Sequence, residues 1–308
     1  MNIKKVAVLG AGAVGSYVIW GLSQKEEIEL GVIAEGERKE RLQQNGCKIN
    51  GKVYRPNVWT PKEACGVDLL IVALKYGALP EAMESIHKAV GEHTIVMSLM
   101  NGVDSEELIA KHIGKEKLLY SLIKVASHKE NDEYIFDPAT TIGIIFGEQT
   151  QPYQSERVKA VGELFENTGI HYCVTEDIME EIWSKFRLNV CNNLPQAILG
   201  AGVGCYEDSI HMNAIREGLR QELEAIAQAK GIDLSKVSAT SLHGSAVKKN
   251  ARFSTLQDLD AGRHTEIDMF SKALADMGKE LGNATPYNEF TYHMIKALEE
   301  KNDGKFNY

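Results

Sequence analysis

The sequence predicts an α/β protein in which an N-terminal, doubly wound parallel sheet is followed by a C-terminal all-helical domain. Short apolar runs alternate with helical patterns over residues 1–174, as expected for parallel strands joined by helices. A glycine-rich turn joins the first strand to the first helix. After Val174 the β-branched runs nearly vanish and long helical patterns replace them. We therefore place a domain boundary between residues 1–174 and 175–308, because a chain of 308 residues is long for one domain.

The first strand and helix, residues 6–23, are joined by the turn GAGAVG. A strand, a glycine turn and a helix in this order form the fingerprint of a Rossmann-type dinucleotide-binding domain. Gly10 permits the tight turn, Gly12 lets the backbone approach a pyrophosphate, and Gly15 lets the helix pack against the strand. The amide groups at the helix start then face the phosphates, and the residues expected to bind the cofactor are Gly10, Ala11, Gly12, Ala13, Val14 and Gly15. A glycine turn without a ligand is the alternative.

The second predicted strand, residues 28–34, ends at a residue that bears on cofactor choice. Glu35 lies twenty residues beyond Gly15, where an acid commonly binds the ribose 2′-hydroxyl and selects NAD. Arg38 and Arg41 follow closely, however, and an arginine there could instead bind the 2′-phosphate of NADP. The choice between the two cofactors stays open, as does a solvated Glu35 with no ligand.

Polar residues follow two of the remaining predicted strands. Residues 47–58 are expected to form a hairpin closed by Asn50-Gly51. Lys75 follows one buried strand and Asn101 follows the next, so both lie where open α/β sheets bind ligands. The other strands expected in this half are at 67–74, 94–100, 118–126, 141–146 and 170–174. Helices are expected at 80–90, at 155–167 and after Asn101, where Asp104 or Ser105 would be the N-cap.

In the C-terminal half, one predicted helix carries a polar stripe. Lys185, Asn189 and Asn193 are four residues apart, so they share one face of the helix at 176–198. A lysine held among amides and apolar residues is suited to donate a proton. The alternative is a solvated lysine with two surface asparagines. The other helices are expected at 207–230, 235–249, 256–281 and 286–300.

A second concentration of polar residues is the segment FSTLQDLDAGRHTEID at 253–268. Ser254 precedes a helical pattern and is a natural N-cap. The carboxylate of Glu266 could accept hydrogen bonds from substrate hydroxyls or form an ion pair with Arg263. The residues alone do not decide between these interpretations.

Together these residues resemble the ketopantoate reductase (2-dehydropantoate 2-reductase) family, from Val6 to about Ile295. The shared marks are GAGAVG at 10–15, LK at 74–75, NG at 101–102, WxKxxxNxxxN at 183–193, and SxLQDL with GRHTEID from 254. The last two are the discriminating ones. The resemblance implies an oxidoreductase that reduces 2-dehydropantoate to D-pantoate by hydride transfer from NADP(H), on the route to pantothenate and coenzyme A.

The resemblance also implies a role for each candidate residue. It makes Lys185 the general acid, whose charge also stabilises the developing alkoxide, and it adds Glu266 and Asn101 as catalytic residues. The residues implied to bind substrate are Lys185, Asn189, Asn193, Ser254 and Glu266. Those expected to bind cofactor, besides the glycine turn, are Lys75 and Asn101, together with Glu35 from the dinucleotide fingerprint. The first domain would thus bind the dinucleotide and the helical domain the substrate.

Two departures from the family pattern keep other functions open. Glu35 stands where the family often has an arginine for the NADP 2′-phosphate, which makes NAD(H) the alternative cofactor. Ala251 stands three residues before Ser254, where the family tends to have asparagine, and Asn250 comes one place earlier. An NAD-dependent D-2-hydroxyacid dehydrogenase acting on another 2-keto acid is therefore the main alternative. A non-catalytic dinucleotide-binding regulator is a third.

The composition and charge of the sequence restrict the kinds of partner that the protein is expected to bind. The net charge of −9 disfavours a nucleic-acid surface, and no apolar run is long enough to span a membrane. The five cysteines are scattered without a CxxC pair, which favours free thiols in a reducing cytoplasm and gives no metal motif. The start of the sequence shows no targeting signal. We expect a small 2-keto acid as the substrate, and the apolar faces of five helices could support a homodimer.

Overall fold

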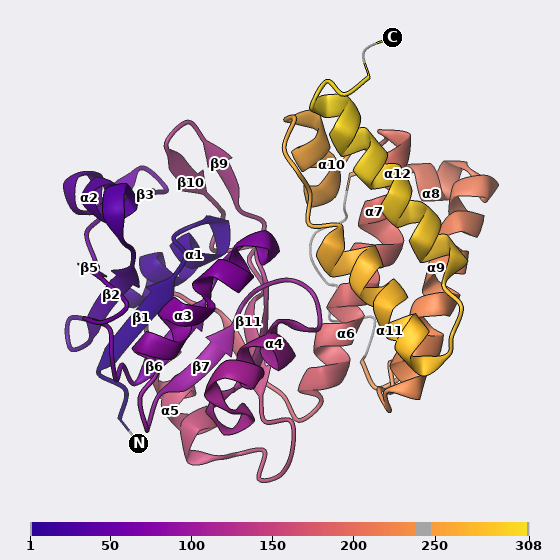
Figure 1. The fold of residues 1–308 in the computed structure, drawn as a ribbon. Helices are drawn as coiled ribbons and strands as arrows, with labels where there is room; N and C mark the ends of the chain where they lie inside the picture. Colours follow the sequence, from indigo (N-terminus) through magenta and orange to yellow (C-terminus); the bar gives the residue numbers. More distant parts are fainter. Residues whose placement is uncertain (1, 238–247, 307) are drawn as a thin grey trace. The chain divides into compact units, whose positions relative to one another are not determined.

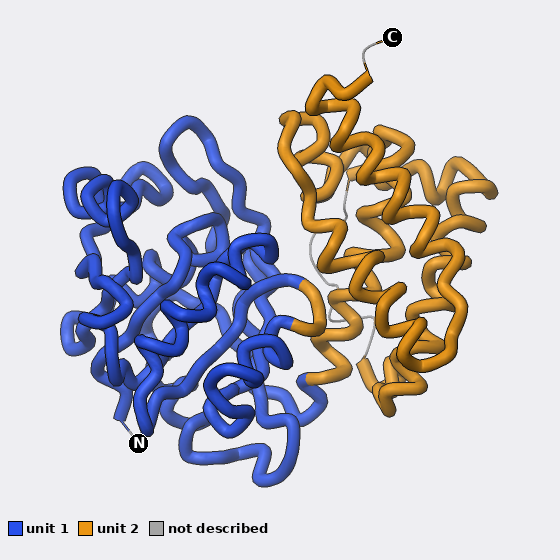
Figure 2. The backbone as a smooth tube through the Cα atoms, viewed as in Figure 1, with its two compact units in different colours: residues 1–101, 105–178 blue, residues 102–104, 179–308 orange. Residues whose placement is uncertain are grey.

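The computed structural model describes residues 2–237, 248–306 and 308. The chain divides into two compact units, shown in different colours in Figure 2. Unit 1 comprises residues 1–101 and 105–178, and unit 2 comprises residues 102–104 and 179–308. This division follows Ile178, whereas the sequence analysis placed the boundary after Val174.

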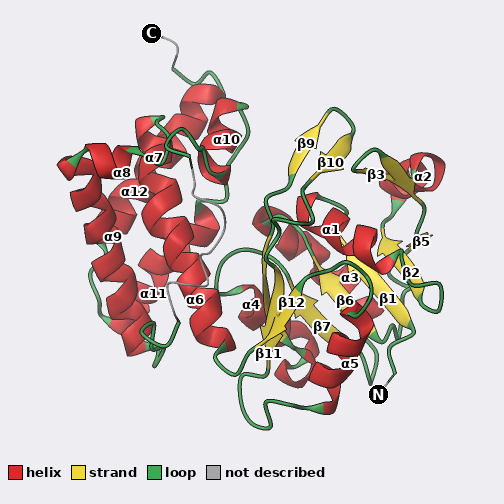
Figure 3. Ribbon diagram, turned by 180° about the vertical axis from the view of Figure 1, so that it is seen from behind, coloured by secondary structure: helices red, strands yellow, loops and turns green. Residues whose placement is uncertain are grey.

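A five-stranded parallel sheet forms the centre of unit 1 (Figure 3). Its strands, in spatial order, are β5 (Asn57–Trp59), β2 (Glu29–Ile33), β1 (Lys5–Leu9), β6 (Leu69–Val72) and β7 (Ile95–Ser98). In the register, Val6 of β1 pairs with Leu30 on one side and Leu69 on the other. Because β2 and β6 flank β1, the strand order reverses there, which is where such sheets bind ligands. The predicted parallel sheet is confirmed.

Helices and two small sheets complete unit 1 (Figure 1). The α-helices are α1 (Ala13–Leu22), α2 (Gly36–Asn45), α3 (Leu79–Ala89), α4 (Ser105–Ile113) and α5 (Glu156–Phe165). Short 3-10 turns are η1 (Tyr76–Ala78) and η2 (Lys115–Lys117). One small sheet has the order β4 (Lys52–Tyr54), β3 (Cys47–Ile49), β10 (Glu133–Ile135), β9 (His128–Glu130). The other has the order β12 (Tyr172–Val174), β11 (Gly143–Gly147), β8 (Tyr120–Lys124).

Three features of unit 1 differ from the expectation. The hairpin closed by Asn50-Gly51 ends at Tyr54, and residues 57–59 pair with β2 in parallel instead. No strand is predicted from the sequence between residues 127 and 140, yet β9 and β10 form a hairpin there. Helix α2 was also missed, since it has no buried residue and therefore no apolar periodicity.

Aromatic packing holds the four-stranded sheet against α1. Phe136, directly after β10, makes edge contacts with Tyr17 and Trp20 of α1, at ring-centroid distances of 5.2 and 5.5 Å. The Tyr17 hydroxyl accepts a hydrogen bond of 2.9 Å from the amide of His171. The ring contacts of Phe136 fix this sheet against α1, and the bond from His171 ties α1 to the segment before β12.

All regular elements that unit 2 forms among its described residues are helical, as predicted. Its elements are α6 (Ile178–Leu188), the π-helical turn η3 (Asn189–Asn193), α7 (Leu194–Leu199), α8 (Cys205–Asp208), α9 (Ile210–Ala229), α10 (Ser254–Asp260), the π-helical turn η5 (Asp268–Lys272), α11 (Ala273–Leu281) and α12 (Pro286–Asn302). The predicted helix at 176–198 is thus divided by a π turn, and that at 256–281 by the loop 261–267. Most of the helix predicted at 235–249 lies outside the described residues.

Three further findings concern chemistry. All five cysteines are unpaired thiols. Among the described residues, no cluster of His, Cys, Asp and Glu side chains could hold a metal ion. None of the helices built from those residues combines the length and apolar character that a membrane span requires.

Candidate functional site

The glycine turn has the sterics that the fingerprint requires. Gly10 adopts φ of +108°, and a Cβ there would lie 2.5 Å from the carbonyl oxygen of Ala73, just beyond β6. A Cβ on Gly15 would overlap the carbonyl oxygen of Gly10. A Cβ on Gly12, in contrast, would have no atom within 4 Å. The first and third glycines are needed for packing, while the second leaves open space next to the backbone.

The N-terminus of α1 is suited to bind an anion. Its N-cap is Gly12, which has no side chain to bond the first amides, and its first turn contains no acidic residue. The first amides of any helix lack intrahelical partners and carry the positive end of the dipole. A pyrophosphate therefore fits the residues present, and the open side of Gly12 is where it would approach.

The other candidate cofactor residues follow neighbouring strands of the same sheet. Glu35 is exposed and is the N-cap of α2, just after β2. Lys75 is exposed and is the N-cap of η1, just after β6. Asn101 is half-buried and follows β7. Because these strands are parallel, their carboxyl ends share one edge of the sheet. We call Glu35, Lys75, Asn101 and the glycine turn the strand-end residues of unit 1. The structure brings them to the same edge of the sheet.

Buried hydroxyl groups hold the end of β7, just before Asn101. Ser105 Oγ donates to Glu106 Oε2 over 2.8 Å, and Ser98 Oγ donates to Ser105 Oγ over 2.8 Å. Ser121 Oγ donates to the Ser98 carbonyl over 2.8 Å. The bond between Ser98 and Ser105 ties β7 to the start of α4, so the turn that carries Asn101 is held at both ends.

The predicted polar stripe is present in unit 2. Lys185 is half-buried on α6, while Asn189 and Asn193 begin and end the π turn η3. Asn193 Nδ2 donates to Asn189 Oδ1 over 3.1 Å, so the two amides lie side by side. Beside Lys185, the buried rings of Trp183 and Phe186 pack edge to face at 5.7 Å.

Aromatic contacts and π turns join this stripe to the segment that follows Glu266. Phe186 of α6 packs against Phe270 of η5 at 6.3 Å, and η5 contacts η3. A π turn inserts a residue into a helix and changes which side chains share a face, and such turns are frequent at functional sites. Here two of them touch. The elements that carry Lys185 and Asn189 are therefore packed against the segment that begins just after Glu266.

Ser254 is the first residue of α10 and is exposed. The N-cap is Phe253, and no side chain caps this helix, so the expectation that Ser254 is the N-cap was wrong. The amide of Phe253 donates to Gln196 Oε1 over 3.4 Å, and α10 contacts both α7 and η3. Ser254 thus lies on an element packed against the asparagine pair.

Glu266 lies in the loop between α10 and η5 and is half-buried. Arg263, its proposed ion-pair partner, instead pairs with Asp258, with Nε and Nη2 each 2.8 Å from Oδ1. We call Lys185, Asn189, Asn193, Ser254 and Glu266 the polar cluster of unit 2. They lie on, or within two residues of, elements that contact one another.

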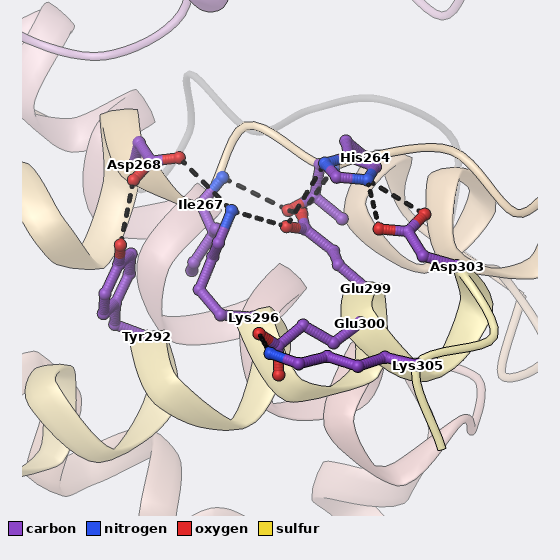
Figure 4. Close-up of polar contacts among 10 residues, drawn as sticks. His264, Ile267, Asp268, Tyr292, Lys296, Glu299, Glu300, Asp303 and Lys305 are labelled. Carbon is purple, nitrogen blue, oxygen red and sulfur yellow. Dashed lines mark hydrogen bonds and ion pairs between the residues drawn. The ribbon is translucent and has the colours of Figure 1, made fainter. Parts of the chain in front are cut away.

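A buried carboxylate on α12 fixes the loop around Glu266 (Figure 4). Glu299 is 2% exposed, and its Oε1 accepts hydrogen bonds of 2.7 Å from both the amide and the hydroxyl of Thr265. Its Oε2 lies 2.7 Å from Lys296 Nζ. Burial alone would raise the pKa of Glu299, but the bonds from Lys296 and Thr265 outweigh it and lower that pKa.

Tyr292 of the same helix and Asp303, directly after it, bind residues on either side of Thr265. Tyr292 donates to Asp268 Oδ1 over 3.2 Å, and His264 Nε2 lies 2.9 Å from Asp303 Oδ2. We call these contacts, with those of Glu299, the α12 clamp. This clamp could not be predicted from the sequence, because the segment around Glu299 has the composition of a solvated helix end and only the tertiary fold buries this carboxylate.

Comparison with known proteins identifies relatives of this chain. A family model described as "Ketopantoate reductase PanE/ApbA" matches residues 6–146, and one described as "Ketopantoate reductase PanE/ApbA C terminal" matches residues 177–299. A 2-dehydropantoate 2-reductase from Mesorhizobium japonicum is 24% identical, with 96% of this chain and 97% of that protein covered. One from Pyrococcus horikoshii is 26% identical, with 97% and 99% covered.

A solved structure shows the same fold. D-mandelate dehydrogenase, in a ternary structure with NADH and anilino(oxo)acetate, superposes with a TM-score of 0.83 at 22% identity. The superposition covers 97% of this chain and 99% of that one. Since the two family models together span most of its length, the chain belongs to the ketopantoate reductase family of oxidoreductases.

Proposed function

We propose that this protein reduces 2-dehydropantoate to D-pantoate with a hydride from NAD(P)H. Family membership and the named relatives support a reductase of this substrate. The observation that carries the proposal is the half-buried Lys185 next to the hydrogen-bonded pair Asn189 and Asn193. This combination supplies one acid and a fixed set of amide groups.

Lys185 is the general acid of the proposed reaction. A reduced nicotinamide supplies the hydride when bound at the glycine turn. As C2 of the keto acid becomes tetrahedral, the carbonyl electron pair moves onto oxygen, and the ammonium group of Lys185 stabilises and then protonates that alkoxide. The neutral amine left behind regains its proton from water.

The neighbouring side chains orient the substrate. Because Asn189 Oδ1 accepts from Asn193, its Nδ2 group is left to donate to a substrate oxygen. The exposed hydroxyl of Ser254 binds the polar end of the substrate, and Glu266 accepts from its hydroxyl groups. Asn101, at the end of β7, is a further catalytic residue by family resemblance. The α12 clamp keeps Glu266 in place.

Replacement of Lys185 tests this mechanism. Lys185→Ala is expected to lower kcat by about a thousandfold, the usual contribution of a general acid, while the cofactor Kd stays nearly unchanged. Lys230→Ala, which removes an exposed lysine from the same unit, is the matched control and leaves kcat unaltered. An unchanged kcat in Lys185→Ala would remove the proposed acid.

The cofactor is NADP(H) by family resemblance, with NAD(H) as the alternative that Glu35 favours. An exposed carboxylate at the N-cap of α2 accepts a hydrogen bond from a ribose 2′-hydroxyl and repels a 2′-phosphate. The D-mandelate dehydrogenase structure carries NADH, which agrees with this alternative. Titration of the protein with NADPH and with NADH measures the preference directly.

A second candidate function keeps the reaction and changes the substrate. The D-mandelate dehydrogenase likeness and the short side chain of Ala251 both favour an NAD-dependent D-2-hydroxyacid dehydrogenase acting on another 2-keto acid. Turnover of 2-dehydropantoate and phenylglyoxylate with each cofactor separates the two. Faster turnover of phenylglyoxylate with NADH supports the dehydrogenase. Cofactor binding without any turnover supports a regulator.

The protein is also proposed to form a homodimer through unit 2. Ile210 on α9 and Phe290 on α12 are 82% and 62% exposed, and these two helices contact each other. Light scattering after size exclusion gives the mass, and a monomer mass at all concentrations contradicts the dimer. The cytoplasmic location stays a prediction, which the five unpaired thiols favour.

A further inference from the structure

A buried tyrosine from α8 contacts the backbone where the π turn η3 ends and α7 begins. Tyr206 is 7% exposed, and its hydroxyl donates to the carbonyl oxygen of Asn192 over 2.6 Å. The same hydroxyl accepts from the amide of Gln196 over 3.2 Å. A carbonyl and the amide four residues later are the groups that an α-helix bonds to each other. The Tyr206 hydroxyl therefore bridges the helical backbone at the end of the turn that begins with Asn189 and ends with Asn193.

The local sequence explains why a side chain bonds to the backbone at this point. Pro195 directly precedes Gln196 and has no amide hydrogen, so it donates no bond to the preceding turn. The carbonyl groups of η3 thus have one donor fewer than those of an ordinary helix. A tyrosine hydroxyl both donates and accepts, which suits it to join a carbonyl to an amide. Tyr206 thereby stabilises the end of η3.

The position and the protonation of Tyr206 are fixed by its surroundings. Arg216 of α9 lies over the ring, with its Cζ 5.1 Å from the ring centroid. A guanidinium group over an aromatic face is attracted to it. Burial raises the pKa of Tyr206 above its ordinary value of 10, so the hydroxyl keeps its proton at neutral pH. It is therefore always able to donate to Asn192.

The side chain of Gln196 continues this set of contacts to α10. Gln196 is fully buried, and its Oε1 accepts from the amide of Phe253 over 3.4 Å. Phe253 is the N-cap of α10 and directly precedes Ser254. No group among the described residues accepts a hydrogen bond from Gln196 Nε2, so the bond to Phe253 is the polar contact of this side chain. Gln196 thus binds Tyr206 through its backbone and the start of α10 through its side chain.

We propose that Tyr206 and Gln196 are positioning residues for the substrate-binding side chains of unit 2. Tyr206 fixes the π turn that carries Asn189 and Asn193. Gln196 fixes the start of α10, which carries Ser254. The inference rests on the proposed function, in which these asparagine and serine side chains bind the keto acid. Both positioning residues are buried, so they act through their neighbours.

Two conservative variants remove the two contacts separately. Tyr206→Phe keeps the ring and loses only the hydroxyl, and Gln196→Met keeps the length of the side chain but loses both polar atoms. Each is expected to raise the KM for the keto acid about tenfold, the effect of losing one buried hydrogen bond. The kcat should change less than about twofold, because Lys185 lies on α6, before the π turn. The cofactor Kd should stay constant, because the glycine turn belongs to unit 1.

The route of each effect is tested in variants that already lack one substrate-binding group. In Ser254→Ala, Gln196→Met should raise the KM no further, whereas Tyr206→Phe should still raise it about tenfold. In Asn189→Ala, Gln196→Met should keep its effect, whereas Tyr206→Phe should raise the KM less than about twofold. A general loosening of unit 2 would instead raise the KM by the same factor in every background. The dependence on background therefore separates positioning from a merely structural role.

Tyr17→Phe is the matched control for the loss of a buried hydroxyl. Tyr17 is also buried and its hydroxyl also binds the backbone, accepting from the amide of His171 over 2.9 Å, but it belongs to unit 1. Its removal should leave the KM for the keto acid unchanged.

Nuclear magnetic resonance of isotope-labelled protein tests the same contacts without turnover. The side-chain amide resonances of Asn189 and Asn193 should shift in Tyr206→Phe and stay in place in Tyr17→Phe. If wild-type protein reduces no 2-keto acid, the reductase proposal fails and this measurement still decides whether Tyr206 positions the asparagine pair. Unshifted resonances would overturn that role. So would an unchanged KM in Tyr206→Phe and Gln196→Met, or an equal rise in every background.

Discussion

Glu299→Ala removes the central acceptor of the α12 clamp. The change leaves the amide and hydroxyl of Thr265 without their 2.7 Å partner and breaks the 2.7 Å pair with Lys296. Each buried donor left unsatisfied costs about 1–3 kcal/mol. Lys296 is 34% exposed and keeps Asp268 at 3.8 Å, so its own loss is small. We expect the free energy of unfolding of unit 2 to fall by about 3 kcal/mol.

Glu299→Gln refines this test because glutamine keeps an oxygen that can accept from Thr265 while it loses the charge. It should cost about half as much as Glu299→Ala. Urea unfolding is followed by the fluorescence of Trp183, which is buried in unit 2, in a background where Trp20 and Trp59 are phenylalanine. Both variants should raise the KM for the keto acid several-fold while the cofactor KM stays constant, because Glu266 loses its support.

Asp303→Asn is the matched control for the clamp. Asp303 and its partner His264 are 50% and 62% exposed, so weakening this pair should cost less than about 0.5 kcal/mol. Equal losses of stability in Glu299→Ala and Asp303→Asn would refute the argument from burial. A large loss of stability in Glu299→Gln without any change in substrate KM would refute its positioning role.

Three further predictions follow from unit 1. Gly15→Ala should destabilise the unit and lower cofactor affinity, because its Cβ overlaps backbone, whereas Gly12→Ala should keep the thermal midpoint and lower only cofactor affinity. Glu35→Gln should shift the ratio of NADPH to NADH affinity toward NADPH by about tenfold, as titration would show. Burial alone would raise the pKa of Glu148, but hydrogen bonds from Arg157 and Ser155 lower it. The pKa of Glu148 in the folded state therefore lies below the ordinary value of 4.5. Its charge stabilises the fold at neutral pH, and this contribution is lost as the pH falls below about 4.5. Glu148→Gln should make the free energy of unfolding depend less on pH in that range.

The features that could be predicted from the sequence are those that depend on residues close together in the chain. Gly10 and Gly15 are required by backbone sterics within one turn, and those sterics are visible as a glycine spacing. The side-by-side amides of Asn189 and Asn193 follow from helical periodicity, which survived even though a π turn replaced the α-helix there. The parallel sheet followed from buried apolar runs, because strands covered on both faces lack polar positions.

Features that depend on distant segments could not be found this way. Helix α2 buries no residue, and β9 and β10 are three-residue strands, so their formation depends on neighbours rather than on an apolar pattern of their own. Arg263 forms its ion pair with Asp258 rather than with Glu266, because the conformation of the loop places the Asp258 carboxylate within hydrogen-bonding distance.

The sequence by itself determined the alternation of strands and helices, the glycine turn and the side-by-side amides of Asn189 and Asn193, since each depends on spacing along the chain. Tertiary structure alone decided that Glu299 is buried against Thr265 and that Tyr206 binds the backbone of Asn192 and Gln196. The physical reason is that burial and hydrogen bonds between distant residues are properties of packing. Segments far apart in the chain are brought to the same place only when the whole unit folds.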